Sequence, residues 1–380
     1  MEPIRVLQED VIMGAGGIEA FLMNVYRHID REALQFDFMV HREEEGCFEK
    51  EILQYGGKIY RTPKFNPFKM HAFRKGIEDV ITSHPEYKVI HCHTELNLWP
   101  LKYAHKLGVP VRIAHRHNAK TVLNLKYFFF LYERMFIKRH CTDMFMCSSP
   151  AGEWAYGKNA VESGKVKLIK NGIETERFRF DQTVREEVRR ELGLGNKTAI
   201  GHVGRFDVPK NHTFLIDIFE QIHRKNPNTV LVMAGEQQGP IMDNMKKKVE
   251  KLGLTDCVQF LGMRRDVNRI YQAMDMFIFP SLWEGLPLTV IEAQTSGLPV
   301  LMSDVIAGET VVTPNVDPLS LDLGAEQWAD AALKKLEGFD RRDCSGIVTD
   351  AGFDIRTTAA FLQEFYIEQT LKARRAQQNK

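Results

Sequence analysis

Short apolar runs alternate with longer amphipathic stretches along most of the chain. In the first half, these runs cover residues 5–8, 36–40, 89–91, 111–114, 144–147 and 166–169. The pattern restarts in the second half, with runs at residues 198–204, 229–234, 258–261, 276–279 and 299–302. Strand-like runs separated by helical periodicity are typical of parallel α/β sheets. The sequence therefore predicts an α/β fold with two doubly wound, Rossmann-like units in tandem.

The length of the chain supports this division. Its 380 residues exceed what one hydrophobic core usually organises, and a hydrophobic content of 44% can fill two cores. We expect an N-terminal domain at residues 1–180 and a C-terminal domain at 181–355, because the polar stretch 181–197 separates the two series of runs. Residues 356–380 are expected to form an amphipathic helix that packs on one domain. Ligands bind beyond the carboxyl ends of strands in open sheets, so we predict a central cleft between the domains.

The spacing of the cysteines and the lengths of the apolar runs indicate where in the cell the protein is located. Six cysteines lie at scattered positions without the spacing of a metal finger or a redox motif, as in a reduced protein. The chain enters its first apolar run without a charged and then apolar leader. No apolar run approaches the roughly 18 residues that a membrane span needs. We expect a cytoplasmic protein.

Basic residues gather in the segment 102–139, which starts at Lys102 and ends at Arg139. Although the whole chain has 51 basic and 50 acidic residues, positions 101–140 hold nine Lys or Arg and one acid, Glu133. Aromatic side chains are interleaved with them. This composition predicts either peripheral contact with an anionic membrane or a buried aromatic helix with basic residues on its exposed side. We expect no nucleic-acid partner, because no recognisable binding motif accompanies the basic residues.

A glycine-rich loop with Gly14, Gly16 and Gly17 follows the first apolar run and opens a predicted helix. Glycine lets the backbone approach a phosphate or a sugar closely. The third glycine of a dinucleotide fingerprint would fall at Glu19, which argues against a nicotinamide enzyme. The loop predicts either a ligand-binding turn or a structural turn that needs a positive φ.

Two glutamates, Glu284 and Glu292, flank a Gly-Leu-Pro turn after the apolar run at 276–279. Proline suits the first turn of a helix, so we expect Pro287 there, Glu284 in the loop and Glu292 on the helix. A carboxylate can accept both hydroxyl protons of a vicinal diol, and a helix N-terminus suits a phosphate. Taken alone, this spacing is more typical of solvated surface glutamates, since two glutamates at a fixed separation are common by chance.

Arg205 and Lys210 follow the run at 198–204, at the expected carboxyl end of a strand. A planar guanidinium and an ammonium could clamp a diphosphate and stabilise the charge on a departing phosphate. The alternative is a pair of solvated cations.

Two His-x-His pairs end neighbouring runs, His91 with His93 and His115 with His117. Either pair could resemble metal ligands, but a third ligand at suitable spacing is missing. Structural histidines, or a substrate contact by His93, are the other interpretations. The chain contains no Asp-x-Asp, the usual sign of a divalent ion on a nucleotide diphosphate. We therefore expect no metal and no cofactor.

The order of these landmarks resembles the retaining GT-B glycosyltransferases of family 4. They are Gly16-Gly17-Ile18-Glu19, His91-x-His93, Ile169-x-Asn171-Gly172-Ile173, Gly204-Arg205 with Lys210, Phe260-Leu261-Gly262 with Asp266, and the block from Asp275 to Glu292. They extend over nearly the whole chain, and the last is the most specific. The subtype resembles capsular and exopolysaccharide glycosyltransferases of bacteria. The chain departs from the family at Asn211, where many relatives carry glycine, and over residues 340–354.

The resemblance implies roles for the candidate residues in binding the donor. Glu292 would bind the ribose hydroxyls of the donor, and Glu284 a hydroxyl of the transferred sugar. Arg205 and Lys210 would hold the diphosphate. His93 would contact the donor sugar near its anomeric centre.

The loops would contribute backbone rather than side chains. By the same resemblance, Gly16 and Gly17 would let the first domain close over the donor. Gly285, Leu286 and Pro287 would present their backbone to the sugar and the phosphate.

The implied reaction is metal-independent transfer, with retention, of a hexosyl or N-acetylhexosaminyl group from a nucleotide-diphosphate sugar, with UDP expected. The acceptor would be a glycan or a lipid-linked molecule in surface polysaccharide biosynthesis, which fits attachment at the inner face of the cell membrane. Catalysis would rest on Glu284, His93, Arg205 and Lys210. Two other classes stay open: a nucleotide-sugar epimerase of similar fold and a non-catalytic sugar-nucleotide-binding protein.

Overall fold

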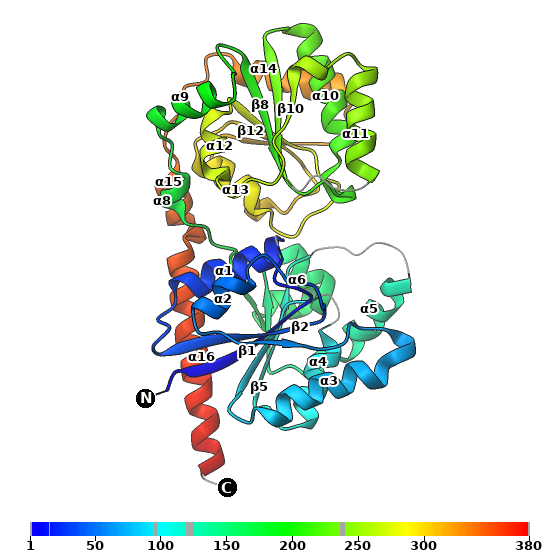
Figure 1. Cartoon of the computed structure of the whole chain (residues 1–380), viewed down its shortest axis with the longest axis vertical. Helices are drawn as coiled ribbons and strands as arrows, with labels where there is room; N and C mark the ends of the chain where they lie inside the picture. Colours follow the sequence, from blue (N-terminus) through cyan, green and yellow to red (C-terminus); the bar gives the residue numbers. More distant parts are fainter. Residues whose placement is uncertain (1, 15, 95–96, 119–124, 236–239, 379–380) are drawn as a thin grey trace. The chain divides into compact units, whose positions relative to one another are not determined.

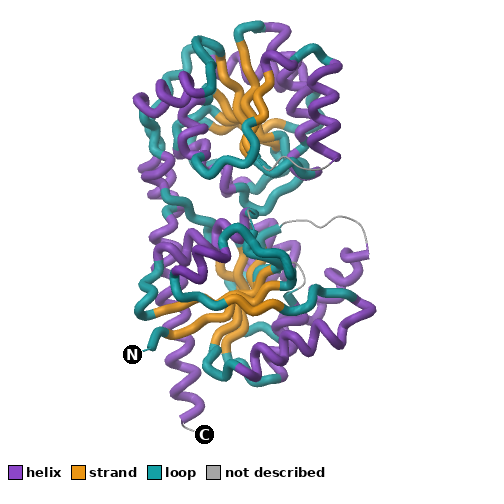
Figure 2. Tube along the Cα trace, viewed as in Figure 1, coloured by secondary structure: helices purple, strands orange, loops and turns teal. Residues whose placement is uncertain are grey.

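The computed structural model describes residues 2–14, 16–94, 97–118, 125–235 and 240–378. The chain forms two compact units, one made of Met1–Gly172 and Ile355–Lys380 and the other of Ile173–Asp354. Within each unit, helices surround a central group of strands, as Figure 2 shows. The predicted doubly wound α/β architecture is confirmed.

The first unit is built on a 7-stranded sheet in the order β3-β2-β1-β4-β5-β6-β7, and its pairs are parallel. The strands are β1 (Ile4–Asp10), β2 (Leu34–Val40), β3 (Ile59–Arg61), β4 (Val89–Cys92), β5 (Val111–Arg116), β6 (Asp143–Met146) and β7 (Val166–Leu168). The helices are α1 (Gly17–His28), α2 (Glu49–Gln54), α3 (Met70–Ser83), α4 (Leu98–Lys106), α5 (Leu125–Phe136), α6 (Ser149–Tyr156), α7 (Lys158–Glu162) and α16 (Ile355–Gln378). The strand order reverses direction between β1 and β4, which is where ligands bind in such sheets.

Both faces of this sheet are buried. Val6 and Phe38 belong to one apolar cluster, while the next residues along their strands, Leu7 and Met39, belong to another. Adjacent residues of a strand point to opposite faces, so each face has its own core. Burial on both faces explains why the strands are continuous apolar runs rather than alternating ones.

The second unit has a 6-stranded sheet in the order β10-β9-β8-β11-β12-β13, also with parallel pairs. The strands are β8 (Thr198–Val203), β9 (Thr229–Ala234), β10 (Val258–Phe260), β11 (Met276–Phe279), β12 (Val300–Ser303) and β13 (Val316–Leu319). The helices are α8 (Thr175–Phe178), α9 (Gln182–Glu191), α10 (His212–Lys225), α11 (Pro240–Lys251), α12 (Val267–Ala273), α13 (Leu288–Thr295), α14 (Ala325–Leu336) and α15 (Ser345–Val348). Here the order reverses between β8 and β11, and Arg205, Lys210 and Glu284 follow these two strands.

The last helix, α16, belongs to the first unit and lies beside α1 (Figure 1). Leu362, Phe365 and Tyr366 on this helix join the apolar cluster that contains Phe36. The Tyr366 hydroxyl also lies 2.6 Å from His91 Nδ1. The tail therefore completes the core of the first unit.

The change from the first unit to the second comes earlier than residue 180. The first segment of the first unit ends at Gly172, and α8 already packs in the second unit, where the Phe178 carbonyl accepts a hydrogen bond from Ser296 Oγ at 2.8 Å. The polar composition of residues 181–197 reflects the exposed helix α9 rather than the boundary itself. Among the described residues, no helix combines the length and apolarity needed to cross a membrane.

Candidate functional site

The loop after β11 places the two predicted glutamates as expected. Glu284 lies in the loop, and Glu292 lies on α13. Pro287 is the residue just before the helix rather than in its first turn, with φ −74° and ψ 110°. Its extended ψ is not helical, so the first turn begins at Leu288.

Lys210 and Glu284 come together in the second unit. Lys210 Nζ donates to Glu284 Oε1 at 2.8 Å, and the ammonium lies 4.7 Å from the centre of the Phe279 ring. The two charged side chains are only 18% and 15% exposed. Shielding from water makes this ion pair stronger than a typical surface pair. The structure thus joins the ends of β8 and β11 through opposite charges.

Backbone contacts hold the same two loops together. Leu282 N donates to the Pro209 carbonyl at 2.7 Å, and Asn211 Nδ2 donates to the Pro280 carbonyl at 3.2 Å. Asn211 has φ 53°, in the left-handed region that asparagine tolerates better than most residues. The departure from glycine at this position therefore preserves the backbone conformation that a glycine would adopt.

Glu292 has a partner that the sequence did not indicate. The Tyr271 hydroxyl on α12 donates to Glu292 Oε2 at 2.9 Å. Burial raises the pKa of the Glu292 carboxyl to about 7, although this hydrogen bond opposes the shift. Arg341 in turn donates to the Tyr271 carbonyl at 3.0 Å. Nothing in the spacing of Tyr271 and Glu292 could have revealed the pair, since the two residues lie on different helices.

The other predicted residues of the second unit are not members of the Lys210–Glu284 or Tyr271–Glu292 pairs. Arg205 is exposed, and its side chain has no ion pair or hydrogen bond to the part of the chain that the structure describes. Gly285, Leu286 and Pro287 are buried. A Cβ atom on Gly204 would lie 3.4 Å from Lys210 Cδ, so glycine leaves the lysine room to reach Glu284.

The glycine at position 16 is explained by a neighbouring side chain of the same loop and helix. Gly16 precedes α1 with φ −101°, and neither Gly14 nor Gly17 has a positive φ. A Cβ atom on Gly16 would lie 2.1 Å from Glu19 Oε2, whereas one on Gly17 would meet nothing within 4 Å. Because none of the three glycines has a positive φ, the positive-φ interpretation is wrong. The Glu19 carboxylate fills the space beside Gly16 instead. Gly14 and Gly17 both leave room, since the nearest atom to a Cβ would be 3.7 Å away at Gly14 and beyond 4 Å at Gly17.

Four histidines form a buried cluster on one face of the first sheet. His91 and His115 stack with their ring centres 5.2 Å apart and an angle of 11° between the rings. His93 Nδ1 lies 3.0 Å from His117 Nε2, and His93 Nε2 lies 3.0 Å from Gln8 Oε1. Burial, followed by the neighbouring rings His91 and His117, keeps the pKa of His93 well below its usual value. These rings are neutral at physiological pH.

Several nitrogens of this cluster lack partners in the described part of the chain. They are His91 Nε2, both ring nitrogens of His115, and His117 Nδ1. One ring nitrogen each of His91, His93 and His115 lies within 4.8 Å of the other two, so these neutral rings could hold a metal ion. The third ligand that seemed missing comes from the neighbouring strand. Both nitrogens of His93 are already engaged, so binding an ion would break one of its contacts.

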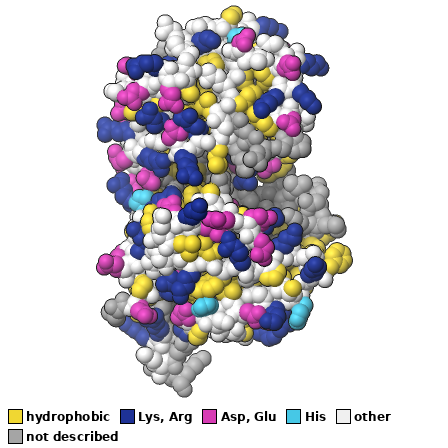
Figure 3. Space-filling view, viewed as in Figure 1, with side chains coloured by type: hydrophobic (Ala, Val, Ile, Leu, Met, Phe, Trp, Pro, Cys, Tyr) yellow, Lys and Arg dark blue, Asp and Glu magenta, His cyan; other side chains and the backbone are white. Residues whose placement is uncertain are grey.

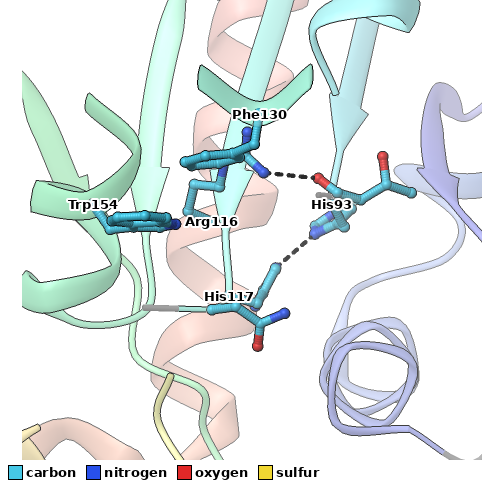
Figure 4. Close-up of a pocket in the computed structure, with 7 residues that line it drawn as sticks. His93, Arg116, His117, Phe130 and Trp154 are labelled. Carbon is cyan, nitrogen blue, oxygen red and sulfur yellow. Dashed lines mark hydrogen bonds between the residues drawn. The ribbon is translucent and has the colours of Figure 1, made fainter. Parts of the chain in front are cut away.

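A small cavity of about 10 Å³ adjoins His93. Its lining also includes Thr94, Arg116, His117, Asn118, Phe130 and Trp154 (Figure 4). The Phe130 and Trp154 rings stack at 5.0 Å, and the Arg116 guanidinium lies 5.1 Å from the Phe130 ring centre. Such a volume holds about one water molecule and is too small for a sugar.

Arg116 also forms a buried ion pair with Glu133. Burial raises the pKa of the Glu133 carboxyl to about 7, and the charge of Arg116 opposes that shift. In the sequence, Glu133 stands out only as the single acid of a basic segment. Its isolation among basic residues was the available signal for an internal partner.

Known proteins match both halves of the chain. The family described as Glycosyltransferase Family 4 matches residues 15–177, and the family described as Glycosyl transferases group 1 matches residues 184–343. EpsF of Bacillus subtilis (strain 168), named as a glycosyltransferase, is 31% identical over 374 residues, which are 95% of this chain and 96% of EpsF. An Escherichia coli enzyme, named UDP-Gal:alpha-D-GlcNAc-diphosphoundecaprenol alpha-1,3-galactosyltransferase, is 28% identical over 55% of each chain.

A solved structure agrees with the fold. HepE of Anabaena, in complex with UDP and glucose, superposes with a TM-score of 0.73 and 17% identity, covering 99% of this chain and 100% of HepE. At this identity the likeness concerns the fold, which is GT-B, while the match to EpsF extends over almost all of both sequences. The chain belongs to the group 1, family 4 glycosyltransferases.

Proposed function

We propose that the chain transfers a hexosyl or N-acetylhexosaminyl group, with retention, from a UDP-sugar to a glycan or lipid-linked acceptor in surface polysaccharide biosynthesis. The Lys210–Glu284 pair carries this proposal, because it puts a cation and a carboxylate together beyond the ends of β8 and β11. The names of the relatives support the substrate class: the Escherichia coli enzyme is named for UDP-galactose and a diphosphoundecaprenol-linked acceptor, and HepE binds UDP and glucose.

Each glutamate has one oxygen engaged and one available for the donor. Tyr271 occupies Glu292 Oε2, which leaves Oε1 to accept from the ribose hydroxyls. Lys210 occupies Glu284 Oε1, which leaves Oε2 for a hydroxyl of the transferred sugar. The backbone of Gly285, Leu286 and Pro287 would line the same donor.

Arg205 and Lys210 would bind the diphosphate. An ammonium has three donors, and one of them reaches Glu284, so Lys210 can also contact a phosphate oxygen. The exposed Arg205 adds a guanidinium that can bind two oxygens at once. With these cations neutralising the leaving group, we propose that transfer needs neither a divalent metal nor a cofactor.

In the transfer step, the bond between the anomeric carbon and the diphosphate oxygen breaks, and a bond to the acceptor oxygen forms. The acceptor proton passes to the departing phosphate, whose negative charge Arg205 and Lys210 stabilise. His93 would contact the sugar after exchanging one of its present partners, and Gly16 and Gly17 would form the loop nearest the donor in the first unit.

Peripheral contact with a membrane belongs to the same proposal. Within segment 102–139, residues 119–124 lie outside the described part of the chain. On α5, Phe130 is 3% exposed, but Phe128 and Met135 are 68% and 72% exposed. The helix thus combines a buried aromatic side with apolar residues in water, beside the basic residues Lys138 and Arg139.

The test is a transfer assay with UDP- and GDP-sugars and a panel of glycan and lipid-diphosphate acceptors, with and without EDTA. We expect release of UDP that depends on the acceptor, continues in EDTA and yields a product with the anomeric configuration of the donor. The same donors incubated without acceptor and followed by NMR separate the alternatives. Epimerised sugar would indicate an epimerase, and binding without turnover across the panel would indicate a sugar-nucleotide-binding protein.

A further inference from the structure

A second and larger pocket, of about 470 Å³, lies among the helices of the first unit. It is lined by Arg74 of α3, by Lys102, Tyr103, His105 and Lys106 of α4, and by His140. All these side chains except Tyr103 are basic, and no acid lines the pocket. On the face shown in Figure 3, by contrast, acidic and basic side chains are interspersed.

The pocket lies away from the candidate residues of the same unit. The chain leaves α4 at Lys106 and enters β5 at Val111, so His105 and Lys106 lie near the amino end of that strand. His140 likewise comes just before β6. His93 and Arg116, in contrast, lie at the carboxyl ends of β4 and β5. The pocket is therefore a site separate from the cavity beside His93.

The positive charges of the pocket are largely uncompensated. Arg74 pairs with Glu78 at 2.8 Å, but Lys102 and Lys106 have no ion pair with any residue that the structure describes. Lys102 Nζ lies 5.2 Å from the centre of the Trp99 ring, a contact that leaves its charge unneutralised. Like charges in one hollow repel each other, so an anion bound there would be attracted by all of them.

The two histidines contribute ring nitrogens for hydrogen bonding rather than further charge. His105 Nδ1 and His140 Nδ1 lie 3.1 Å apart, so one ring must donate to the other. Burial lowers the pKa of His140, and so do the charges of His105, Lys102, Arg112 and Arg139. The C-terminus of α4 would by itself favour basic residues at His105 and Lys106. It gives no reason for Arg74 and His140, which reach the same pocket from other elements.

We propose that this pocket binds a phosphate group, with Lys102 and Lys106 as its main cationic contacts. Its volume falls in the range of small-molecule sites, roughly 300–1,000 Å³. A phosphate carries up to two negative charges and three acceptor oxygens, which suits donors that converge from three elements. The phosphate could belong to the headgroup of an anionic lipid or to a soluble molecule. The site does not depend on the proposed sugar transfer.

The first arm of the test is calorimetric titration of the full chain with inorganic pyrophosphate at low ionic strength, in the presence of saturating UDP so that the proposed diphosphate site at Arg205 and Lys210 is occupied. The K102Q/K106Q variant should bind it about tenfold more weakly than the unmodified chain, because two charged contacts are lost. The matched control is K246Q/K247Q on α11, which removes the same charge from two exposed positions of the second unit. The control should bind pyrophosphate like the unmodified chain.

The second arm is sedimentation with phosphatidylglycerol vesicles, with phosphatidylcholine vesicles as reference, and it also tests the proposed membrane contact. Loss of both pyrophosphate and phosphatidylglycerol binding in K102Q/K106Q supports a lipid headgroup as the source. Loss of pyrophosphate binding alone supports a soluble phosphate. If K102Q/K106Q matches K246Q/K247Q in both arms, the phosphate site is refuted. Binding of UDP should be equal in all variants, so a failure of the proposed donor site would be recognised separately.

Discussion

The carboxylates of the second unit and the histidines of the first unit are fixed in different ways. Glu284 has the Lys210 ammonium at 2.8 Å, and Glu292 has the Tyr271 hydroxyl at 2.9 Å. The rings of His91, His93, His115 and His117 pack on one another. His91, His93 and His117 also have hydrogen-bond partners, whereas His115 has none in the described part of the chain. An ion pair and a hydroxyl preorganise the two carboxylates, whereas ring packing together with hydrogen bonds between neutral groups orients the histidines.

This contrast also separates the two regions by their response to pH. Burial keeps the histidines uncharged, so they contribute no change of charge near neutral pH. Glu292, with a pKa of about 7, changes charge in that range. Glu133 of the first unit also has a pKa of about 7, but it pairs with Arg116 and is not a proposed donor contact. Dependence of donor binding on pH should therefore originate at Glu292 in the second unit.

The largest effect is expected from Lys210→Ala. The change removes a diphosphate contact and leaves Glu284 without its partner, so kcat/KM should fall by about 10²–10³-fold. The matched control is Lys248→Ala, which removes an ion pair of 2.5 Å with Asp217 on the same unit but far along the chain from the candidate loops. Steady-state transfer rates of both variants decide the matter. Equal rates for the two would show that the Lys210–Glu284 pair is only structural.

A smaller effect is expected from Tyr271→Phe. The loss of one hydrogen bond to a carboxylate should weaken UDP binding by roughly tenfold. In the unmodified chain, binding should be strong above pH 7, where Glu292 is ionised, and should weaken as pH falls through about 7. Because the Tyr271 hydroxyl lowers the pKa of Glu292, the variant should lose binding at a higher pH.

Titration of UDP binding between pH 5.5 and 8.5, in both proteins, checks this prediction. A Tyr271→Phe profile that is weaker but has the same midpoint would mean that the hydroxyl acts through packing rather than on the Glu292 charge.

The smallest effect is expected in the histidine cluster. His115→Leu conserves volume and removes two buried nitrogens without partners, so the free energy of unfolding should stay equal or rise. His91→Leu loses the contact with the Tyr366 hydroxyl and should cost about 1 kcal/mol. Urea unfolding of the two variants gives the comparison. A larger loss for His115→Leu would show that this ring has a partner, such as a buried water or a metal ion.

The interior strands could be predicted because burial on both faces makes them apolar runs. The run at 229–234 coincides with β9, and that at 276–279 coincides with β11. The edge strands β3 and β13 were not predicted, since they are short and largely accessible to water. Pro318 within β13 also argues against a strand, although an edge strand tolerates it.

The candidate site was predictable in part. The loop and helix positions of Glu284 and Glu292 followed from the local pattern, because proline and glycine mark the turn between them. The partners Tyr271 and Arg116 could not be inferred, since they reach the site from distant parts of the sequence. The requirement for glycine at position 16 could not be inferred either, because it depends on the Glu19 side chain folding back toward Gly16.

The position of α16 has a consequence for synthesis on the ribosome. The second unit is one continuous stretch, Ile173–Asp354, and all of it emerges before α16 is made. The first unit, although synthesised earlier, lacks the Tyr366 ring that packs on Phe36 and the hydroxyl that contacts His91 until α16 has been added. One face of the N-terminal sheet therefore stays without its α16 partner until the rest of the chain has been translated. The second unit, whose synthesis starts later, can therefore complete its fold before the first unit.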